Sequence, residues 1–308
     1  MKVLVTGGAG FIGSNLVTYL CDQGHQVSVI DNLSFGFKDL IDKRAKFYKG
    51  SISDNGLLEK ILPHMDVVFH LASIATISLS MTKPYIYFDN NFMEGIALLE
   101  AMKKTGVKKI VYSSSASSYG NLQKDFFTEE DSPQPTNPYG ASKSCFEPAL
   151  SAYHHSFGID AIALRYFNVY GPADDQADTP RAVPIWIKAA LKGEPLILYW
   201  QGKQRRDYVF VEDIARANLL AAEKGKGFRV YNVGCGNGIW MTDIIEELEK
   251  LFGRKLSIKD AGERAGDSPH VVADISRIKK ELGWEPKVGL KDGLQRTINY
   301  YKDRIHKI

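Results

Sequence analysis

Short apolar runs alternate with amphipathic stretches along the first half of the chain. The apolar runs end in polar residues or glycine and predict strands at 2–6, 26–30, 67–71, 109–113 and 161–165. Stretches with helical periodicity lie between them, at 13–23, 56–62, 90–104 and 138–157. Strands that are apolar throughout are typical of sheets covered on both faces. The pattern therefore predicts an α/β fold built on a doubly wound parallel sheet.

The pattern changes after Gly171. A polar loop runs from Gly171 to Pro180, and the alternation then weakens into helices and short strands. We expect a smaller C-terminal α/β lobe to begin there, next to the larger sheet.

A glycine-rich turn joins the first predicted strand to the first predicted helix, with glycines at Gly7, Gly10 and Gly13. Glycine lets the backbone approach a pyrophosphate, whose charge is stabilised by the N–H groups at a helix N-terminus. The first gap is one residue longer than in the dinucleotide fingerprint, so the turn alone is a weak signal. Asp31 strengthens it, because it ends the next strand where a carboxylate binds ribose hydroxyls. With no arginine directly after it, Asp31 favours NAD over NADP; its structural alternative is a turn-forming aspartate.

Tyr139 and Lys143 are four residues apart and share one face of a predicted helix. An exposed tyrosine above an exposed lysine is the structural alternative. Ser115 follows the fourth strand at its carboxyl end, where ligands collect in open α/β sheets. A tyrosine with a pKa of about 10 is protonated at neutral pH and cannot act as a base there. Lowering this pKa by three units requires roughly 4 kcal/mol of stabilisation of the phenolate relative to the phenol. We expect Lys143 to supply this stabilisation and Ser115 to hydrogen-bond the same substrate oxygen.

Composition narrows the function classes. The 308 residues are 44% hydrophobic and carry a formal net charge of +3, which suits a globular protein with one large core or two lobes. Lysine and arginine form no basic stripe, so we expect no nucleic-acid partner. The three cysteines share no short spacing, so we expect no disulfide framework and no metal site. No apolar stretch approaches the roughly 20 residues that span a bilayer, and we expect a cytoplasmic protein without a membrane partner.

Several further motifs occur in an order that resembles one family. The sequence is similar to the extended short-chain dehydrogenase/reductases, specifically the nucleotide-sugar epimerases and dehydratases. The segments that carry the resemblance are GGAGFIG at 7–13, DNL at 31–33, HLA at 70–72, SSSA at 113–116, YG at 119–120, YGASK at 139–143, RYFNVYGP at 165–172, RDYV at 206–209 and GW at 283–284. His70, within one of them, is expected to be a core residue rather than a ligand.

The resemblance implies roles for individual residues. Ser115, Tyr139 and Lys143 would be catalytic. Asn168, Arg206, Arg264 and Asp267 would hold the nucleotide diphosphate and its ribose, and Ser115 and Val271 would face the sugar. The residues implied for NAD are Gly7, Gly10, Phe11, Ile12, Gly13, Asp31, Asn32, Leu33, Ser34, Gly36, Ser51, Ile52, Leu71, Ala72, Ser73, Asn90, Ser113, Tyr139, Lys143, Tyr166 and Phe167. Ser51 departs from the family pattern, which usually has an aspartate contacting adenine there.

The resemblance also implies an organisation. A late strand near 230–233 would return to the main sheet, so 1–170 plus about 207–236 would form the NAD-binding Rossmann-type domain. About 171–206 plus 237–308 would form the nucleotide-sugar lobe. Relatives pair through two helices per subunit, here 90–104 and 138–157, which implies a homodimer.

The residues after Ser115 distinguish the reactions of the family. Dehydratases place an Asp-Glu pair there, whereas this chain has Ala116 and Ser117. Without a carboxylate to abstract the C5 proton, we expect NAD-dependent C4 epimerisation of a UDP-sugar through a transient 4-keto sugar. The resemblance implies that Val271, the fourth residue after Asp267, stands where a tyrosine in relatives excludes N-acetyl groups. UDP-N-acetylhexosamines are therefore expected beside UDP-glucose and UDP-galactose.

Alternatives stay open. A UDP-hexuronate 4-epimerase, a 4-ketoreductase, a 5-epimerase or a dehydratase would use the same scaffold. A non-catalytic NAD-binding regulator is a further alternative, although such proteins tend to lose the tyrosine and the lysine.

Overall fold

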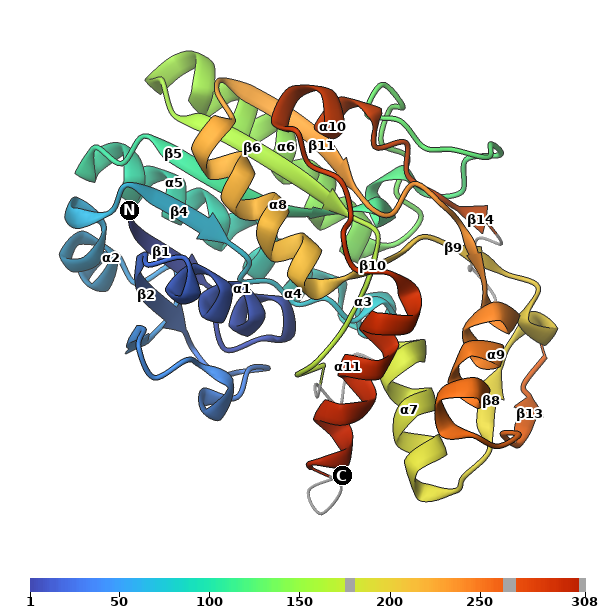
Figure 1. Ribbon diagram of the computed structural model, residues 1–308. Helices are drawn as coiled ribbons and strands as arrows, with labels where there is room; N and C mark the ends of the chain where they lie inside the picture. The colour runs from blue at the N-terminus through green and yellow to red at the C-terminus, as the bar shows by residue number, and fades with distance from the viewer. Residues whose placement is uncertain (175–180, 263–269, 305–308) are drawn as a thin grey trace.

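A parallel sheet of seven strands forms the centre of the protein (Figure 1). The computed structural model describes residues 1–174, 181–262 and 270–304. The strand order is β11-β6-β5-β4-β1-β2-β3, and every neighbouring pair is parallel. The strands are β1 (Lys2–Thr6), β2 (Gln26–Asp31), β3 (Lys46–Lys49), β4 (Val67–His70), β5 (Lys109–Ser115), β6 (Asp160–Tyr166) and β11 (Phe228–Val233). The predicted doubly wound, Rossmann-type α/β fold is confirmed, including the late strand.

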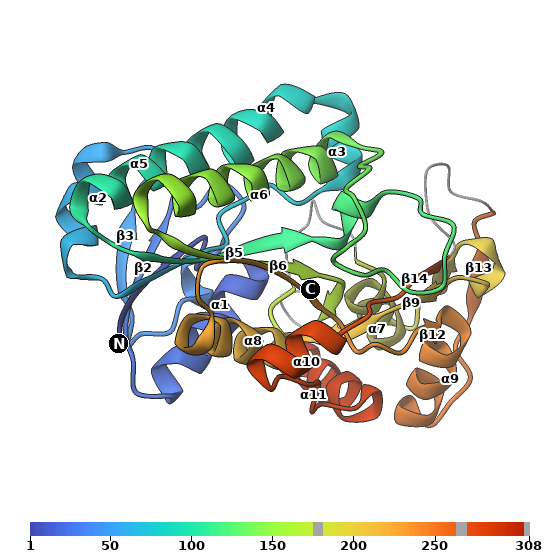
Figure 2. The ribbon, with the colours of Figure 1, turned by 90° about the horizontal axis from the view of Figure 1, so that it is seen from above.

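Helices cover both faces of this sheet (Figure 2). One face carries α1 (Phe11–Asp22), α8 (Val211–Lys224) and α10 (Ser276–Leu282), and the other carries α2 (Asn55–Ile61), α5 (Glu94–Thr105) and α6 (Pro138–Phe157). A separate apolar core lies on each side, because each helix buries one apolar face against strands that are apolar on both. The predicted helices agree with these, with small shifts at their ends.

One strand of the main sheet and one turn in the helices that cover it were not predicted. The edge strand β3 has lysines at both ends and half-buried aromatic residues between them, so it lacks the continuous apolar run that identified the other strands. The predicted helix at 90–104 begins as a π-helical turn at Asp89–Met93, which continues α4 (Pro84–Phe88) into α5. His70, at the end of β4, is buried as expected.

A second group of elements packs around its own apolar core. Its helices are α7 (Ala182–Lys192), α9 (Met241–Phe252) and α11 (Leu290–Lys302), and its small sheets pair β8 (Leu196–Leu198) with β13 (Ile258–Asp260) and β9 (Arg205–Arg206) with β12 (Ile239–Trp240) and β14 (His270–Val271). A further pair, β7 (Asn168–Tyr170) and β10 (Tyr208–Phe210), connects this group to the main sheet. Side chains of α10 and Trp284, which the predicted division assigned to the second lobe, lie instead in the core under α8.

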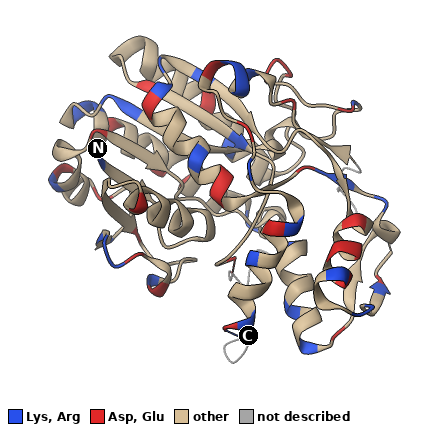
Figure 3. Cartoon of the chain, in the orientation of Figure 1, with Lys and Arg blue, Asp and Glu red and all other residues tan. Residues whose placement is uncertain are grey.

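Positions of lysine and arginine alternate with positions of aspartate and glutamate along the helices in Figure 3. None of the helices in the described residues is both long and apolar enough to cross a membrane.

Candidate active site

A cavity of about 1100 Å³ lies at the carboxyl edge of the parallel sheet. Its walls come from the turn after β1, from the ends of β2, β4 and β5, and from the second group of elements. Pockets for a single small ligand usually measure roughly 300–1,000 Å³. This cavity is large enough to hold a dinucleotide and a second ligand together.

The glycine turn brings backbone close to backbone. Gly7 has a φ of +70°, and a Cβ there would lie 2.6 Å from the Ala72 nitrogen; a Cβ on Gly13 would lie 2.1 Å from the Gly7 oxygen. Gly10 caps α1 without a side-chain hydrogen bond. The first N–H groups of the helix have no acceptor within the helix. They line the cavity and form a site for a phosphate.

Asp31 lies at the end of β2 with its carboxylate held in place. Its oxygens accept hydrogen bonds from the backbone N–H groups of Ala9, at 3.0 Å, and Leu33, at 2.8 Å. Burial raises the pKa of Asp31, and the two backbone hydrogen bonds act in the opposite direction. A carboxylate oxygen has two lone pairs, so each can also accept a ribose hydroxyl.

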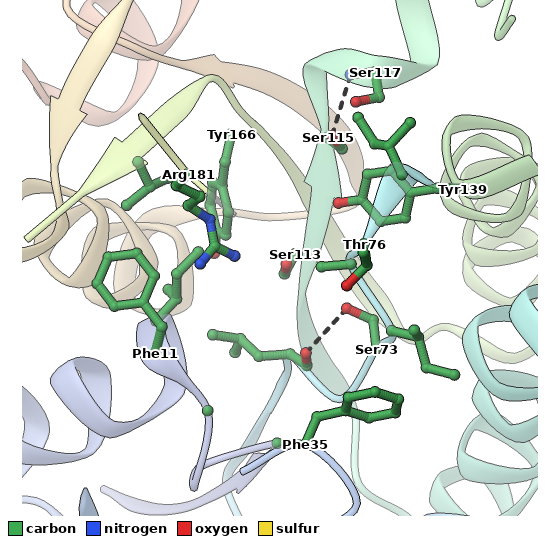
Figure 4. Close-up of a pocket in the computed structure, with 18 of the residues that line it drawn as sticks. Phe11, Phe35, Ser73, Thr76, Ser113, Ser115, Ser117, Tyr139, Tyr166 and Arg181 are labelled. Atoms are coloured by element: carbon green, nitrogen blue, oxygen red, sulfur yellow. Dashed lines mark hydrogen bonds between the residues drawn. The ribbon is translucent and has the colours of Figure 1, made fainter. Parts of the chain in front are cut away.

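Tyr139 projects into the middle of the cavity from the first turn of α6 (Figure 4). The helix begins sharply because the Asn137 side chain accepts a hydrogen bond from the Gly140 N–H at 2.8 Å and Pro138 occupies the first turn. Ser115, the last residue of β5, lies beside the ring. Its Oγ accepts a hydrogen bond from the Ser117 N–H at 3.1 Å, which leaves its own proton to be donated to another oxygen.

Burial raises the pKa of the Tyr139 hydroxyl, while hydrogen bonding to Ser115 and the charge of Arg181 act to lower it. Arg181 faces Tyr139 across the cavity, with Ser113 between them in Figure 4. Its guanidinium lies 5.1 Å from the centre of the Phe11 ring and forms an ion pair with Asp174. Arg181 was not predicted, because it belongs to no motif and only the fold carries it to the cavity.

Lys143 lies beneath the cavity rather than in its lining. Its Nζ donates a hydrogen bond to the Ser113 carbonyl at 2.6 Å and lies 4.9 Å from the centre of the Tyr112 ring. Burial lowers the pKa of Lys143 to about 7. The expected effect of Lys143 on the pKa of Tyr139 stays a prediction.

A buried ion pair supports the strand and the helix from behind. Both guanidinium-to-carboxylate hydrogen bonds of the Arg165–Glu147 pair are formed, at 3.0 and 2.6 Å, and the Ser114 hydroxyl donates to Glu147 at 2.6 Å. Both side chains are almost fully buried. The contacts join β5, β6 and α6, and so fix Tyr139 relative to Ser115.

The far end of the cavity contains two of the residues implied for the nucleotide. Arg206 and Asn168 line it from β9 and β7. The Asp207 carbonyl accepts hydrogen bonds from the backbone N–H and the side-chain amide of Asn168, at 2.9 and 3.3 Å. The buried Asp207 carboxylate accepts backbone N–H groups of Cys235, Gly236 and Ala273, and burial raises its pKa to about 6.

Most residues predicted from the sequence border this one cavity. They are Gly7, Gly10, Phe11, Ile12, Gly13, Asp31, Asn32, Ser34, Gly36, Ser51, Ile52, Leu71, Ala72, Ser73, Asn90, Ser113, Ser115, Tyr139, Tyr166, Phe167, Asn168 and Arg206. Leu33, Lys143 and Val271 do not line it. Arg264 and Asp267 lie outside the described residues.

Comparison with known proteins decides the family. The profile of the NAD dependent epimerase/dehydratase family matches residues 3–234. The chain belongs to this family. The UDP-glucose 4-epimerase of Lactobacillus helveticus is 37% identical over 93% of this chain and 92% of its own length.

Solved structures of family members cover the whole fold. A UDP-glucose 4-epimerase from Thermotoga maritima, solved with UDP-glucose, has a TM-score of 0.95 and 38% identity and covers 99% of this chain and 100% of its own. A UDP-N-acetylglucosamine 4-epimerase from Methanobrevibacter ruminantium, in complex with UDP-N-acetylmuramic acid, has a TM-score of 0.93 and 35% identity and covers 98% of each chain. The glycine turn, the α1 N-terminus and Asp31 fit the NAD that gives the family its name.

The buried Lys143 generates a prediction about stability. Its folded pKa lies below its ordinary value of 10.5. Burial of the charged form therefore destabilises the fold; this destabilisation is complete below about pH 7 and fades as the pH rises toward 10.5. Replacing Lys143 with Met is expected to raise the free energy of unfolding at pH 7 by about 2–4 kcal/mol and to remove the rise in stability between pH 7 and 10. Urea unfolding across this range measures both effects. Lys104→Met, at an exposed position, is the control, and a destabilised Lys143→Met would contradict the interpretation.

Proposed function

We propose that this protein is an NAD-dependent 4-epimerase of UDP-sugars. The observation that carries the proposal is the position of the Tyr139 hydroxyl beside Ser115 in a cavity that extends from the glycine turn to Arg206. Bound NAD would supply the redox chemistry, as acceptor and later donor of a hydride at C4 of the sugar. The chain supplies binding, orientation and proton transfer.

Tyr139 and Ser115 would act on one substrate oxygen. The Tyr139 oxygen accepts the proton of the sugar 4-hydroxyl, and the Ser115 hydroxyl donates a hydrogen bond to the oxygen as it becomes a carbonyl. The proton returns from Tyr139 when the carbonyl is reduced on its other face. Arg181 and the buried Lys143 would favour the deprotonated phenol, because positive charge near a phenol lowers its pKa.

The carboxylates around the cavity favour epimerisation over elimination. Among the described lining residues, the carboxylates are Asp31, Asp89 and Glu94. They come from β2, from the π-helical turn before α5 and from the first residue of α5, not from the elements that carry Ser115 and Tyr139. The turn after Ser115 contributes Ser117 to the lining, whose hydroxyl cannot serve as the base for C5 at neutral pH.

The nucleotide would lie at the far end. A guanidinium forms paired hydrogen bonds with a phosphate, so we assign the diphosphate to Arg206 and, outside the described residues, to Arg264. The proposed division assigns 1–170 plus about 207–236 to NAD and the rest to the nucleotide sugar, with α10 packing on the NAD-binding side.

The activity test uses purified protein with NAD and, in separate reactions, UDP-glucose, UDP-N-acetylglucosamine and UDP-glucuronate. We expect the C4 epimer of at least one, with no net formation of NADH. Tyr139→Phe and Ser115→Ala are expected to lower kcat by about 10²- to 10⁴-fold, since each removes a group that handles the transferred proton. Tyr85→Phe, at an exposed tyrosine, is the control.

The proposal is refuted if none of the three substrates yields its C4 epimer. A stoichiometric requirement for NADH would favour a ketoreductase, and full turnover by Tyr139→Phe would revive a non-catalytic NAD-binding role.

Val271 generates a prediction about the sugar. It pairs with the lining residue Arg206 through β14 and packs against a small cluster that contains Phe167, another lining residue. Val271→Tyr is expected to lower kcat/KM for UDP-N-acetylglucosamine at least tenfold more than for UDP-glucose, because the larger side chain would take the room that the N-acetyl group needs. Val271→Ile, which adds little volume, is the control, and thermal unfolding of both variants detects overpacking. Equal losses for both sugars would contradict the assignment.

We further propose that the protein is a cytoplasmic homodimer that pairs through α5 and α6. The outer face of α6 exposes Cys145, Pro148 and Ala152, and Met93 is exposed at the start of α5. The exposed residues of α6 include no lysine, arginine, aspartate or glutamate, as expected for the centre of an interface, whereas the C-terminal half of α5 exposes Glu100, Lys103 and Lys104. The three cysteines are free thiols.

The assembly can be measured by light scattering after size exclusion. The wild type is expected at twice the mass of one chain and Ala152→Glu at the mass of one chain, because a buried glutamate without a partner opposes association. Lys60→Glu changes the charge on α2 and serves as the control. A monomeric wild type would refute the dimer.

A further inference from the structure

One carboxylate in the cavity has no role in the reaction proposed above. Glu94 lines the end of the cavity that also contains Ser51, Ile52 and Asn90. This is the end where the family resemblance places adenine and where Ser51 replaces the usual aspartate. The chain therefore has a carboxylate at this end, but supplies it from a different element.

The two oxygens of Glu94 have different surroundings. Oε2 accepts hydrogen bonds from the Ser51 hydroxyl at 2.9 Å and from the Asn90 side-chain amide at 3.3 Å. Ser51 is itself held, because its Oγ lies 2.9 Å from the Ser53 hydroxyl and accepts the Ser53 N–H at 3.2 Å. Oε1 receives no hydrogen bond from any described residue. One oxygen orients the carboxylate and the other can accept a ligand donor.

The π-helical turn sets the position of Glu94. The Glu94 N–H donates to the carbonyl of Asp89, five residues earlier, rather than four as in an α-helix. Inside this turn, Asn91 is fixed by the backbone of Ile74, at 2.8 and 3.0 Å, and by the Ser142 hydroxyl at 3.0 Å. Turns of this type are rare and frequently occur at functional sites. Here the turn fixes the register of α5 against the cavity.

We propose that Glu94 recognises the adenine of NAD by accepting a hydrogen bond from its 6-amino group, in place of the aspartate that Ser51 replaces. The inference rests on the proposed NAD-dependent function. A carboxylate is an acceptor only, so it pairs with an amino group and is repelled by a carbonyl oxygen. The apolar side chains of Ile30 and Ile52 line the cavity nearby and suit the faces of a purine, whose edge alone is polar.

The proposal makes the 6-position of the purine the decisive contact. Deamino-NAD, which has hypoxanthine in place of adenine, differs from NAD only in carrying a 6-oxo group and the adjacent ring proton. Calorimetric titration of nucleotide-free protein with each dinucleotide measures the preference without any turnover. The wild type is expected to bind NAD at least tenfold more tightly than deamino-NAD.

Glu94→Gln should abolish this preference, because an amide can either accept from an amino group or donate to a carbonyl. We expect weaker NAD binding and equal or tighter deamino-NAD binding. Glu100→Gln is the matched control, since Glu100 is on the same helix, is exposed and pairs with Lys103; it should keep the wild-type preference.

A double variant tests the replacement directly. Ser51→Asp combined with Glu94→Ala returns a carboxylate to the family position and is expected to restore at least tenfold preference for NAD, which Glu94→Ala alone should lack. Circular dichroism establishes that each variant is folded.

The outcomes separate this inference from the proposed function. A Glu94→Gln protein that keeps the tenfold preference, or a wild type that binds the two dinucleotides equally, overturns the role of Glu94 while NAD binding stands. A wild type that binds neither dinucleotide refutes the NAD-dependent function, and the role of Glu94 with it.

Discussion

The hydroxyl of Thr6 joins the two strands that form the floor of the cavity. Its Oγ accepts hydrogen bonds from the N–H groups of Leu71 and Ala72, at 3.2 and 3.1 Å, and lies 2.9 Å from Nδ1 of His70. Because the oxygen already accepts from these N–H groups, the Thr6 hydroxyl can donate its own proton to Nδ1 of the neutral His70 ring. Burial, which lowers the pKa of His70 to about 3, keeps the ring neutral and the arrangement intact.

This contact explains why the neighbouring position is glycine. It holds the Ala72 backbone against the start of the turn, where a Cβ on Gly7 would collide with it. The same close approach places Gly7, Leu71 and Ala72 on one wall of the cavity. A polar contact at the end of two buried strands thus determines both the shape of the cofactor site and the residue type of its turn.

The part of the site that contains Ser115 and Tyr139 is built at a cost in stability. Lys143, Glu147 and Arg165 are charged groups removed from water behind Ser115 and Tyr139. Buried ion pairs contribute little net stability, because desolvation offsets their attraction. Their contribution here is positional: they connect α6 to β5 and β6, so that the tyrosine on a helix and the serine on a strand reach the same point. The buried Lys143 also lowers the stability of the fold, because its charged form is removed from water.

The strands and helices of the main sheet were predictable because each has a strong local signal: an apolar run, an amphipathic period, a capping residue or a terminating glycine. So were the glycine turn, Asp31, Ser115 and Tyr139, which occur at the ends of such elements. The edge strand β3 and the π-helical turn were not, since a short half-exposed strand and one hydrogen bond of altered register leave little trace in a pattern. Arg181 and Glu94 were missed for another reason: each becomes a site residue only through distant contacts.

The sequence by itself determined the parallel α/β architecture, the family resemblance, the choice of NAD and the tyrosine at the centre of the site, because these depend on residue types at short spacings. Only the tertiary structure decided that Lys143 bonds the Ser113 carbonyl, that Arg181 faces Tyr139 and that Glu94 bonds Ser51 across 43 positions. The physical reason is that the pattern of nearby residues determines how a segment folds locally. The electrostatic field and the hydrogen bonds at one point in a cavity come from several segments, which only tertiary packing brings together.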